Sequence, residues 1–185
     1  LTLTAIATLL APLLTPFLMK TLADEFVPID FTSMLLSIMK IVILPIIAGL
    51  VFNRFAHGRF PWIDKALPIV SMGGIALIIT VITAAGRDSL LEIGGILILA
   101  VIAHNATGYL LGYWGSRLSG LDQKSARTVA FEVGMQNSGL ASGIALEMGR
   151  VATMGLAPAV FGPWMNISGS SLATWWRGKP VKISN

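Results

Sequence analysis

Residues 131–143, FEVGMQNSGLASG, place a carboxylate and two side-chain amides inside an otherwise apolar stretch of the chain. Glu132 and Gln136 are four positions apart, so on a regular helix they share one face. Carboxylate, amide and backbone carbonyl oxygens are the ligands that hard cations take. Gly134 lies between them and permits non-helical backbone, which exposes carbonyl oxygens to such an ion. The motif therefore predicts a sodium site built on a broken membrane helix.

Two other interpretations of this polar cluster stay open. Gln136 and Asn137 can join neighbouring helices through hydrogen bonds, and Glu132 can relay protons instead of binding sodium. An ionisable side chain within the membrane is by default a functional group, because an unpaired charge in hydrocarbon is costly. The cluster therefore favours ion binding, with a proton-coupled or uncoupled organic-anion carrier as the alternative.

The cluster lies in the fifth of six apolar segments. The chain has 185 residues, of which 55% are hydrophobic and 12% are charged, whereas soluble domains have about 25% charged residues. A run of about 20 apolar residues crosses the hydrocarbon core of a bilayer. We expect an all-α, polytopic membrane bundle with one discontinuous helix near 132–138. The segments are 1–23, 31–53, 66–86, 91–115, 123–149 and 155–176.

Lysine and arginine are unequally divided between alternate links of this bundle. One set of links and the tail hold nine: Arg54, Arg59, Lys65, Arg117, Lys124, Arg127, Arg177, Lys179 and Lys182. The opposite links hold three, together with most of the acidic residues: Lys20, Arg87 and Arg150. The positive-inside rule then predicts a cytoplasmic tail, 177–185, in a plasma (inner) membrane protein. Basic residues spread over links also argue against nucleic acid as a partner.

An enzyme acting in the membrane would need a nucleophile–base pair or a cluster of metal ligands. The chain has no cysteine and two histidines. His57 lies in a link, and His104 has neither an acid nor a second histidine near it in sequence. We therefore predict that the protein is not an enzyme.

Three motifs, in this order along the chain, resemble the bile acid:sodium symporter family of secondary transporters. They are TLTAIATLLAPLLTP in the first segment, EVGMQNSGLA in the fifth and WMNISGSSLA in the sixth. The resemblance implies a fold of ten helices in two inverted repeats, with the fourth and ninth helices broken. It places residues 1–23 as the last helix of the first repeat and 31–176 as the second repeat. Since the chain starts at Leu1, we expect it to be a fragment whose four preceding helices are missing.

The resemblance also implies which residues bind the coupling ion, Na⁺. Glu132 matches an acid that joins two sodium sites, and Thr4 matches a hydroxyl ligand of one of them. Val133 and Met135 match positions that contribute backbone carbonyls to the other, where Gln136 contributes its side chain. The implied function is sodium-coupled symport of an organic anion by alternating access.

The candidates for substrate binding are polar side chains within the segments: Lys40, His104, Asn105, Asn137, Asn166 and Ser168. Asn166 matches a cavity-lining position of the family, but Met165 stands where the family often has histidine. This departure favours a small carboxylate, such as a pantothenate-like acid, over a bile-acid-like substrate. Two alternatives stay open: His104 and Asn105 can form interhelical hydrogen bonds, and Lys40 can extend to the membrane interface.

Overall fold

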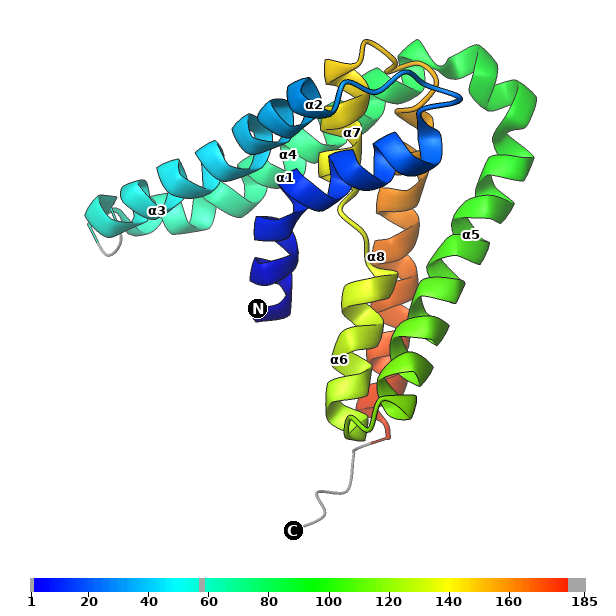
Figure 1. Ribbon diagram of the computed structural model, residues 1–185. Helices are drawn as coiled ribbons and strands as arrows, with labels where there is room; N and C mark the ends of the chain where they lie inside the picture. The colour runs from blue at the N-terminus through cyan, green and yellow to red at the C-terminus, as the bar shows by residue number, and fades with distance from the viewer. Residues whose placement is uncertain (1, 57–58, 180–185) are drawn as a thin grey trace.

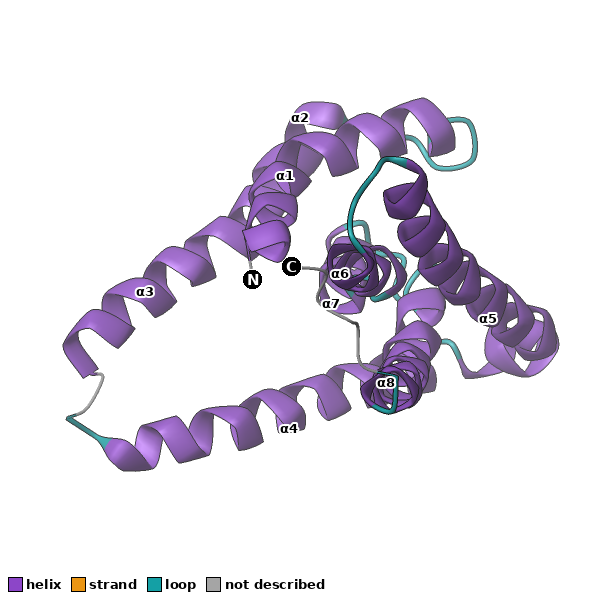
Figure 2. Ribbon diagram, turned by 90° about the horizontal axis from the view of Figure 1, so that it is seen from below, coloured by secondary structure: helices purple, strands orange, loops and turns teal. Residues whose placement is uncertain are grey.

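The computed structural model describes residues 2–56 and 59–179, so His57 and the last six residues lie outside the described part. Every regular element within it is helical, as the composition predicts. The elements are α1 (Thr2–Ala23), α2 (Phe31–Ile38), η1 (Met39–Ile43), α3 (Leu44–Ala56), α4 (Pro61–Ala85), α5 (Arg87–Leu118), α6 (Gln123–Gly134), α7 (Ser138–Glu147) and α8 (Leu156–Arg177). In Figure 1, α5, α6 and α8 run side by side, while α3 and α4 extend away from them; Figure 2 shows the same arrangement from below.

Four stretches of the described residues are helical, long and apolar enough to cross a membrane: Thr2–Ala23, Phe31–Ala56, Pro61–Ala85 and Arg87–Leu118. α8 has a similar length of 22 residues but contains several serines. α6 and α7 have 12 and 10 residues, so neither alone spans about 30 Å of hydrocarbon. Large apolar side chains on α1, α3 and α4 are exposed at the surface of the structure. These features make the chain a multi-pass, helical membrane protein.

Several helices extend beyond the apolar segments that predicted them, α4 and α5 by the most residues. α4 begins at Pro61 rather than at residue 66, because proline suits the first helical turn, where its missing N–H is not needed. α5 covers Arg87–Leu118 rather than 91–115, and its charged ends continue the helix past the apolar run. An apolar run therefore marks the part of a helix that lies in hydrocarbon, and the helix ends fall outside it.

The second apolar segment contains a π-helical turn that the sequence analysis did not predict. In η1, the N–H of Leu44 donates to the carbonyl of Met39, five residues earlier. Pro45 follows directly; it has no N–H, and its ring crowds the preceding turn. A wider turn at this position relieves that crowding and keeps the helix continuous. Lys40 lies in this turn and is exposed.

α5 and α6 pack with their backbones in contact. A Cβ atom built on Gly108 would lie 2.9 Å from the Cα of Gly134, and one on Gly112 would lie 2.9 Å from the Cα of Ala130. Small residues spaced four apart on both helices permit this approach, as they do in many membrane helix pairs. We call these four residues the glycine seam. The seam fixes α6, and with it Glu132, against α5.

The two halves of the fifth segment pack against different neighbours. α6 packs mainly against α5, whereas α7 packs against α2 and α8. A buried apolar cluster of Ile29, Met34 and Ile38 with Ile144 joins α2 and the residues just before it to α7. A break between α6 and α7 is therefore also a boundary between two packing environments.

Four links between helices lie at two ends of the structure. In Figure 1, the α5–α6 turn and the end of α8 lie at one end, and the α1–α2, α4–α5 and α7–α8 links lie at the other. At the first end, Nη1 of Arg127 donates to the carbonyl of Trp176 at 3.3 Å, and its guanidinium lies 5.3 Å above the Trp176 ring. Of the three stretches predicted to be rich in basic residues, the α5–α6 turn and the end of α8 therefore lie together, whereas the α3–α4 link lies elsewhere.

Candidate ion and substrate site

The polar motif folds into a discontinuous helix, as its sequence predicts. α6 ends at Gly134, and Met135 adopts extended backbone with φ −90° and ψ 104°. Asn137 then begins α7 as its N-cap, because its Oδ1 accepts a hydrogen bond of 2.9 Å from the N–H of Leu140. Glycine weakens a helix, and asparagine is a favoured N-cap. The stop and the restart are therefore both local properties of the sequence, although the capping role of Asn137 was not predicted.

The break leaves backbone carbonyls without helical partners. The carbonyl of Val133 accepts a hydrogen bond of 2.5 Å from Nε2 of Gln136, and that of Gly134 accepts one of 2.9 Å from Nδ2 of Asn105. Among the described residues, no backbone N–H donates to the carbonyls of Met135 or Gln136. The C-terminal end of α6 also presents the negative end of its helix dipole. The break thus gathers oxygen atoms that favour a cation.

Thr4 meets this region from the other end of the chain. Its Oγ1 donates a hydrogen bond of 2.7 Å to Oε2 of Glu132. Pro12 and Pro16 lie within α1, and Figure 1 shows that α1 bends along its length, as prolines in a helix cause. Two predicted sodium ligands from separate helices are therefore in direct contact.

A cavity of about 380 Å³ lies between α1 and the break. Four of the five predicted sodium ligands line it: Thr4, Glu132, Met135 and Gln136. Val133 does not line it, and its carbonyl is already engaged by the Gln136 side chain. The described residues include no cluster of three His, Cys, Asp or Glu side chains that could hold a metal ion. A cation here would therefore depend on one carboxylate with hydroxyl, amide and carbonyl oxygens, a set suited to a monovalent ion.

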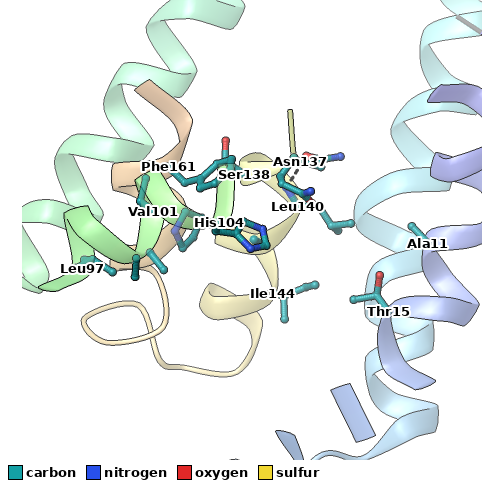
Figure 3. Close-up of a pocket in the computed structure, with 15 residues that line it drawn as sticks. Ala11, Thr15, Leu97, Val101, His104, Asn137, Ser138, Leu140, Ile144 and Phe161 are labelled. Carbon is teal, nitrogen blue, oxygen red and sulfur yellow. Dashed lines mark hydrogen bonds between the residues drawn. The ribbon is translucent and has the colours of Figure 1, made fainter. Parts of the chain in front are cut away.

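A second cavity, of about 560 Å³, adjoins the first. Figure 3 shows Ala11 and Thr15 on α1 facing His104 on α5 across it, with α7 between them. Apolar side chains form most of its wall, and His104, Gln136, Asn137 and Ser138 contribute polar atoms. Gln136, Asn137 and Ser138 line both cavities, so the cavities meet at the break.

The six predicted substrate residues divide into two groups. His104 and Asn137 line the larger cavity; the other four line neither cavity: Lys40, Asn105, Asn166 and Ser168. Nδ2 of Asn166 donates to the carbonyl of Gly162 on its own helix, at 2.8 Å. The ring of His104 contacts the ring of Phe161 edge-on, at 5.5 Å between centroids and 67°.

Asn105 and Ser168 bind each other. Oγ of Ser168 donates to Oδ1 of Asn105 at 2.7 Å, and the hydroxyl of Tyr109 lies 3.3 Å from Oγ of Ser168. Interhelical hydrogen bonding, one of the two roles left open for Asn105, is thus present. Tyr109 was not among the predicted site residues, although its position four residues after Asn105 on a helix indicates a shared face.

The comparisons with known proteins identify the family. A family model described as the Sodium Bile acid symporter family matches residues 1–93, half of the chain. The chain belongs to this family. The predicted membership of this family is thereby confirmed, and the family consists of transporters and not enzymes.

Curated relatives cover nearly the whole chain. An uncharacterized sodium-dependent transporter, YocS, of Bacillus subtilis (strain 168) is 42% identical over 180 residues, which are 97% of this chain and 56% of the relative. A probable sodium/metabolite cotransporter, BASS1, chloroplastic, of Arabidopsis thaliana is 31% identical over 179 residues, 97% of this chain and 45% of the relative. BASS2, a probable sodium/metabolite cotransporter, chloroplastic, of Oryza sativa subsp. japonica is 31% identical over 187 residues, which are 98% of this chain and 43% of the relative. The chain spans about half the length of the curated relatives it matches.

Proposed function

We propose that the protein is a sodium-coupled symporter of a small organic anion, with Na⁺ as a transported ion. The observation that supports this proposal most is the convergence of Thr4, Glu132, Met135 and Gln136 on one cavity at a broken helix. Helices broken within the membrane commonly bind ions through their freed carbonyls in secondary transporters. Relatives named as sodium-dependent transporter and sodium/metabolite cotransporters support the same ion.

In this proposal Na⁺ binds between α1 and the break. Glu132 supplies the formal charge that offsets loss of the ion's hydration shell. The Thr4 hydroxyl, which now donates to Glu132, presents its oxygen lone pairs to the ion. The carbonyls of Met135 and Gln136, which have no backbone donor among the described residues, add dipoles without the loss of a helical hydrogen bond.

Val133 and Gln136 belong to the proposed site in a different way. Nε2 of Gln136 donates to the Val133 carbonyl in this structure, so the amide presents a donor where an ion requires an acceptor. An ion between these groups therefore requires the amide to turn its oxygen inward. That rotation changes Gln136, which lines both cavities, and couples ion binding to the substrate cavity.

The organic anion binds in the larger cavity. Its volume of about 560 Å³ lies in the range typical of small-molecule sites. His104 and Asn137 supply hydrogen-bonding groups, and the apolar wall accommodates a short hydrocarbon portion. A small carboxylate such as a pantothenate-like acid fits this chemistry, with a bile-acid-like anion as the larger alternative.

The proposal includes an arrangement in the membrane. α1 is the last helix of a first repeat, and residues 31–176 form a second, inverted repeat. The protein lies in the plasma (inner) membrane, and its tail, residues 177–185, is cytoplasmic. The preceding helices of the same chain complete the transporter. α6 packs on α5 and α7 on α2, while α8 contacts both α5 and α7. Movement of α5 and α6 relative to α2 and α7 would open or close the break, which alternating access requires.

The test is uptake of labelled small carboxylates, pantothenate among them, by proteoliposomes containing the full-length chain. We expect uptake to require an inward Na⁺ gradient and to stop when K⁺ or choline replaces Na⁺ at equal ionic strength. Uptake that persists without Na⁺ and follows an imposed pH gradient would instead make Glu132 a proton relay. Uptake independent of both gradients would identify an uncoupled carrier.

A further inference from the structure

The carbonyl of Gly134 is the point at which the break is attached to the rest of the bundle. α6 ends at Gly134, so this carbonyl has no helical donor. Nδ2 of Asn105, on α5, donates to it at 2.9 Å. Asn105 is 2% exposed, and a buried carbonyl without a donor would be costly. One side chain therefore satisfies the last residue before the chain leaves helical geometry.

The Asn105 amide is held in one orientation. Its Oδ1 accepts from Oγ of Ser168 at 2.7 Å. The Ser168 hydroxyl has one proton, and the Asn105 oxygen at 2.7 Å is a nearer acceptor than the Met165 carbonyl at 3.2 Å. With that proton directed to Asn105, the Tyr109 hydroxyl, 3.3 Å away, has to be the donor in its contact with the Ser168 oxygen. Turning the amide over would place its oxygen against the Gly134 carbonyl, two acceptors facing each other. The order of donors thus runs from Tyr109 through Ser168 and Asn105 to Gly134.

These side chains are packed away from the cavities. We call the cavity of about 380 Å³ that Thr4 and Glu132 line the ion cavity. Tyr109, Asn105 and Ser168 line neither the ion cavity nor the larger cavity. A Cβ atom on Gly169 would lie 3.2 Å from the Tyr109 hydroxyl and 3.0 Å from Sδ of Met135. A Cβ on Gly134 would overlap the Tyr109 ring. There is no room for a substrate between these groups.

We propose that Asn105, oriented by Ser168 and Tyr109, is a positioning residue for the ion site and not a substrate contact. This inference rests on the proposed sodium site. By anchoring the Gly134 carbonyl, Asn105 fixes the backbone between Glu132 and Met135, whose oxygens line the ion cavity. Loss of the anchor lets Met135 and Gln136 occupy many backbone conformations, and Na⁺ must then order them when it binds.

The experiment measures two half-saturation constants in proteoliposomes: that of Na⁺ at saturating substrate, and that of substrate at saturating Na⁺. Asn105→Leu removes the donor and keeps a similar volume. We expect it to raise the Na⁺ constant about tenfold, the effect of one lost buried hydrogen bond, while the substrate constant stays within about twofold. The reverse split, with substrate affinity lost and Na⁺ dependence unchanged, would make Asn105 a substrate contact and overturn the inference.

Ser168 provides a second test variant and its own control. Ser168→Ala removes the hydroxyl that orients Asn105 and should shift the Na⁺ constant in the same direction, whereas Ser168→Thr keeps the hydroxyl and should restore it. Amide hydrogen exchange of residues 134–138 in the purified protein reports the anchor without transport: we expect faster exchange in Asn105→Leu and Ser168→Ala. Unchanged exchange in both variants would refute the anchoring role even where a variant is inactive.

A parallel Glu132→Gln variant separates this inference from the function on which it rests. If Glu132→Gln abolishes sodium dependence and Asn105→Leu leaves it unchanged, the positioning role is wrong and the sodium site stands. If neither variant changes sodium dependence, the sodium site itself is wrong. If both impair it while Asn105→Leu spares substrate affinity, both proposals are supported.

Discussion

The hydroxyl of Thr4 donates a hydrogen bond of 2.7 Å to the carboxylate of Glu132, across 128 positions of sequence. This contact joins the first turn of α1 to the last turn of α6, just before the break that follows Gly134. Within residues 2–56 and 59–179, the Thr4 hydroxyl is the one side-chain partner of this carboxylate, which therefore retains lone pairs for a cation. The pair is therefore the part of the proposed ion site that mutagenesis can address most directly.

The first prediction concerns the charge of Glu132. Glu132→Gln keeps the shape and one carbonyl oxygen but removes the formal charge, so Na⁺ would face dipoles alone and its desolvation would be poorly offset. We expect sodium-coupled uptake to be abolished while the protein still inserts and folds. Uptake is measured against Na⁺ concentration. Wild-type rates with unchanged sodium dependence would exclude Glu132 from the sodium site.

A second prediction concerns the Thr4 hydroxyl. Thr4→Val removes one oxygen ligand at constant shape, and we expect the half-saturation constant for Na⁺ to rise about tenfold, typical of losing one contact to a charged group. Thr4→Ser keeps the oxygen and should behave as wild type. Thr8→Val is a matched control, since Thr8 lines the same cavity one turn further along α1. Equal effects at Thr4 and Thr8 would indicate altered packing instead.

Much of the ion site could be predicted because its determinants are local in sequence. Gly134 and Asn137 stop and restart the helix within four residues, and the spacing of Glu132 and Gln136 places their oxygens near that break. The partner of Glu132 is different, because nothing local connects residues 4 and 132. The resemblance to a family predicted both as sodium ligands, and the structure shows that they touch.

The partner of the Asn105 amide could not be predicted from its own segment, although interhelical hydrogen bonding was one of the two roles expected for it. Its Nδ2 donates to the carbonyl of Gly134, 29 positions later in the chain. That carbonyl lacks a backbone donor because α6 ends there. The same holds for Ser168, whose hydroxyl faces Asn105 across α5 and α8. Lys40 illustrates the opposite difficulty: its turn depends on the backbone constraint of Pro45, and the structure leaves its side chain outside both cavities.

The glycine seam leads to a prediction about stability. Gly112→Leu would force a side chain against the backbone of Ala130, 2.9 Å from its Cα, and backbone cannot yield as a flexible side chain does. We expect a loss of about 1–3 kcal/mol, as for overpacked interiors, seen as a lower melting temperature of the purified protein. Gly115→Leu on the same helix meets nothing within 4 Å and should be tolerated. Equal destabilisation by both would indicate a helix-wide effect.

Asp122 makes the start of α6 sensitive to pH. Hydrogen bonds from the Ser125 hydroxyl, then from the Ser125 and Lys124 N–H groups, hold the pKa of this carboxyl below its usual value. A lowered folded pKa means stability that is present above the unfolded pKa, about 3.9, and is lost as pH falls through the folded value. The melting temperature of wild type should exceed that of Asp122→Ala at pH 7, with a difference that shrinks below about pH 4. Asp122→Asn, an N-cap that does not titrate, should show no such dependence.

The last prediction concerns His104 and the substrate cavity. Its ring lines the cavity wall and contacts Phe161 edge-on, so its nitrogen atoms are the polar groups that α5 offers to an anion there. His104→Phe preserves an aromatic ring for the Phe161 contact and removes both nitrogens. We expect it to raise the half-saturation constant for substrate about tenfold and to leave that for Na⁺ unchanged, as measured by uptake at saturating concentrations of the other species. Wild-type substrate affinity in His104→Phe, with a loss only in His104→Ala, would limit the residue to packing against α8.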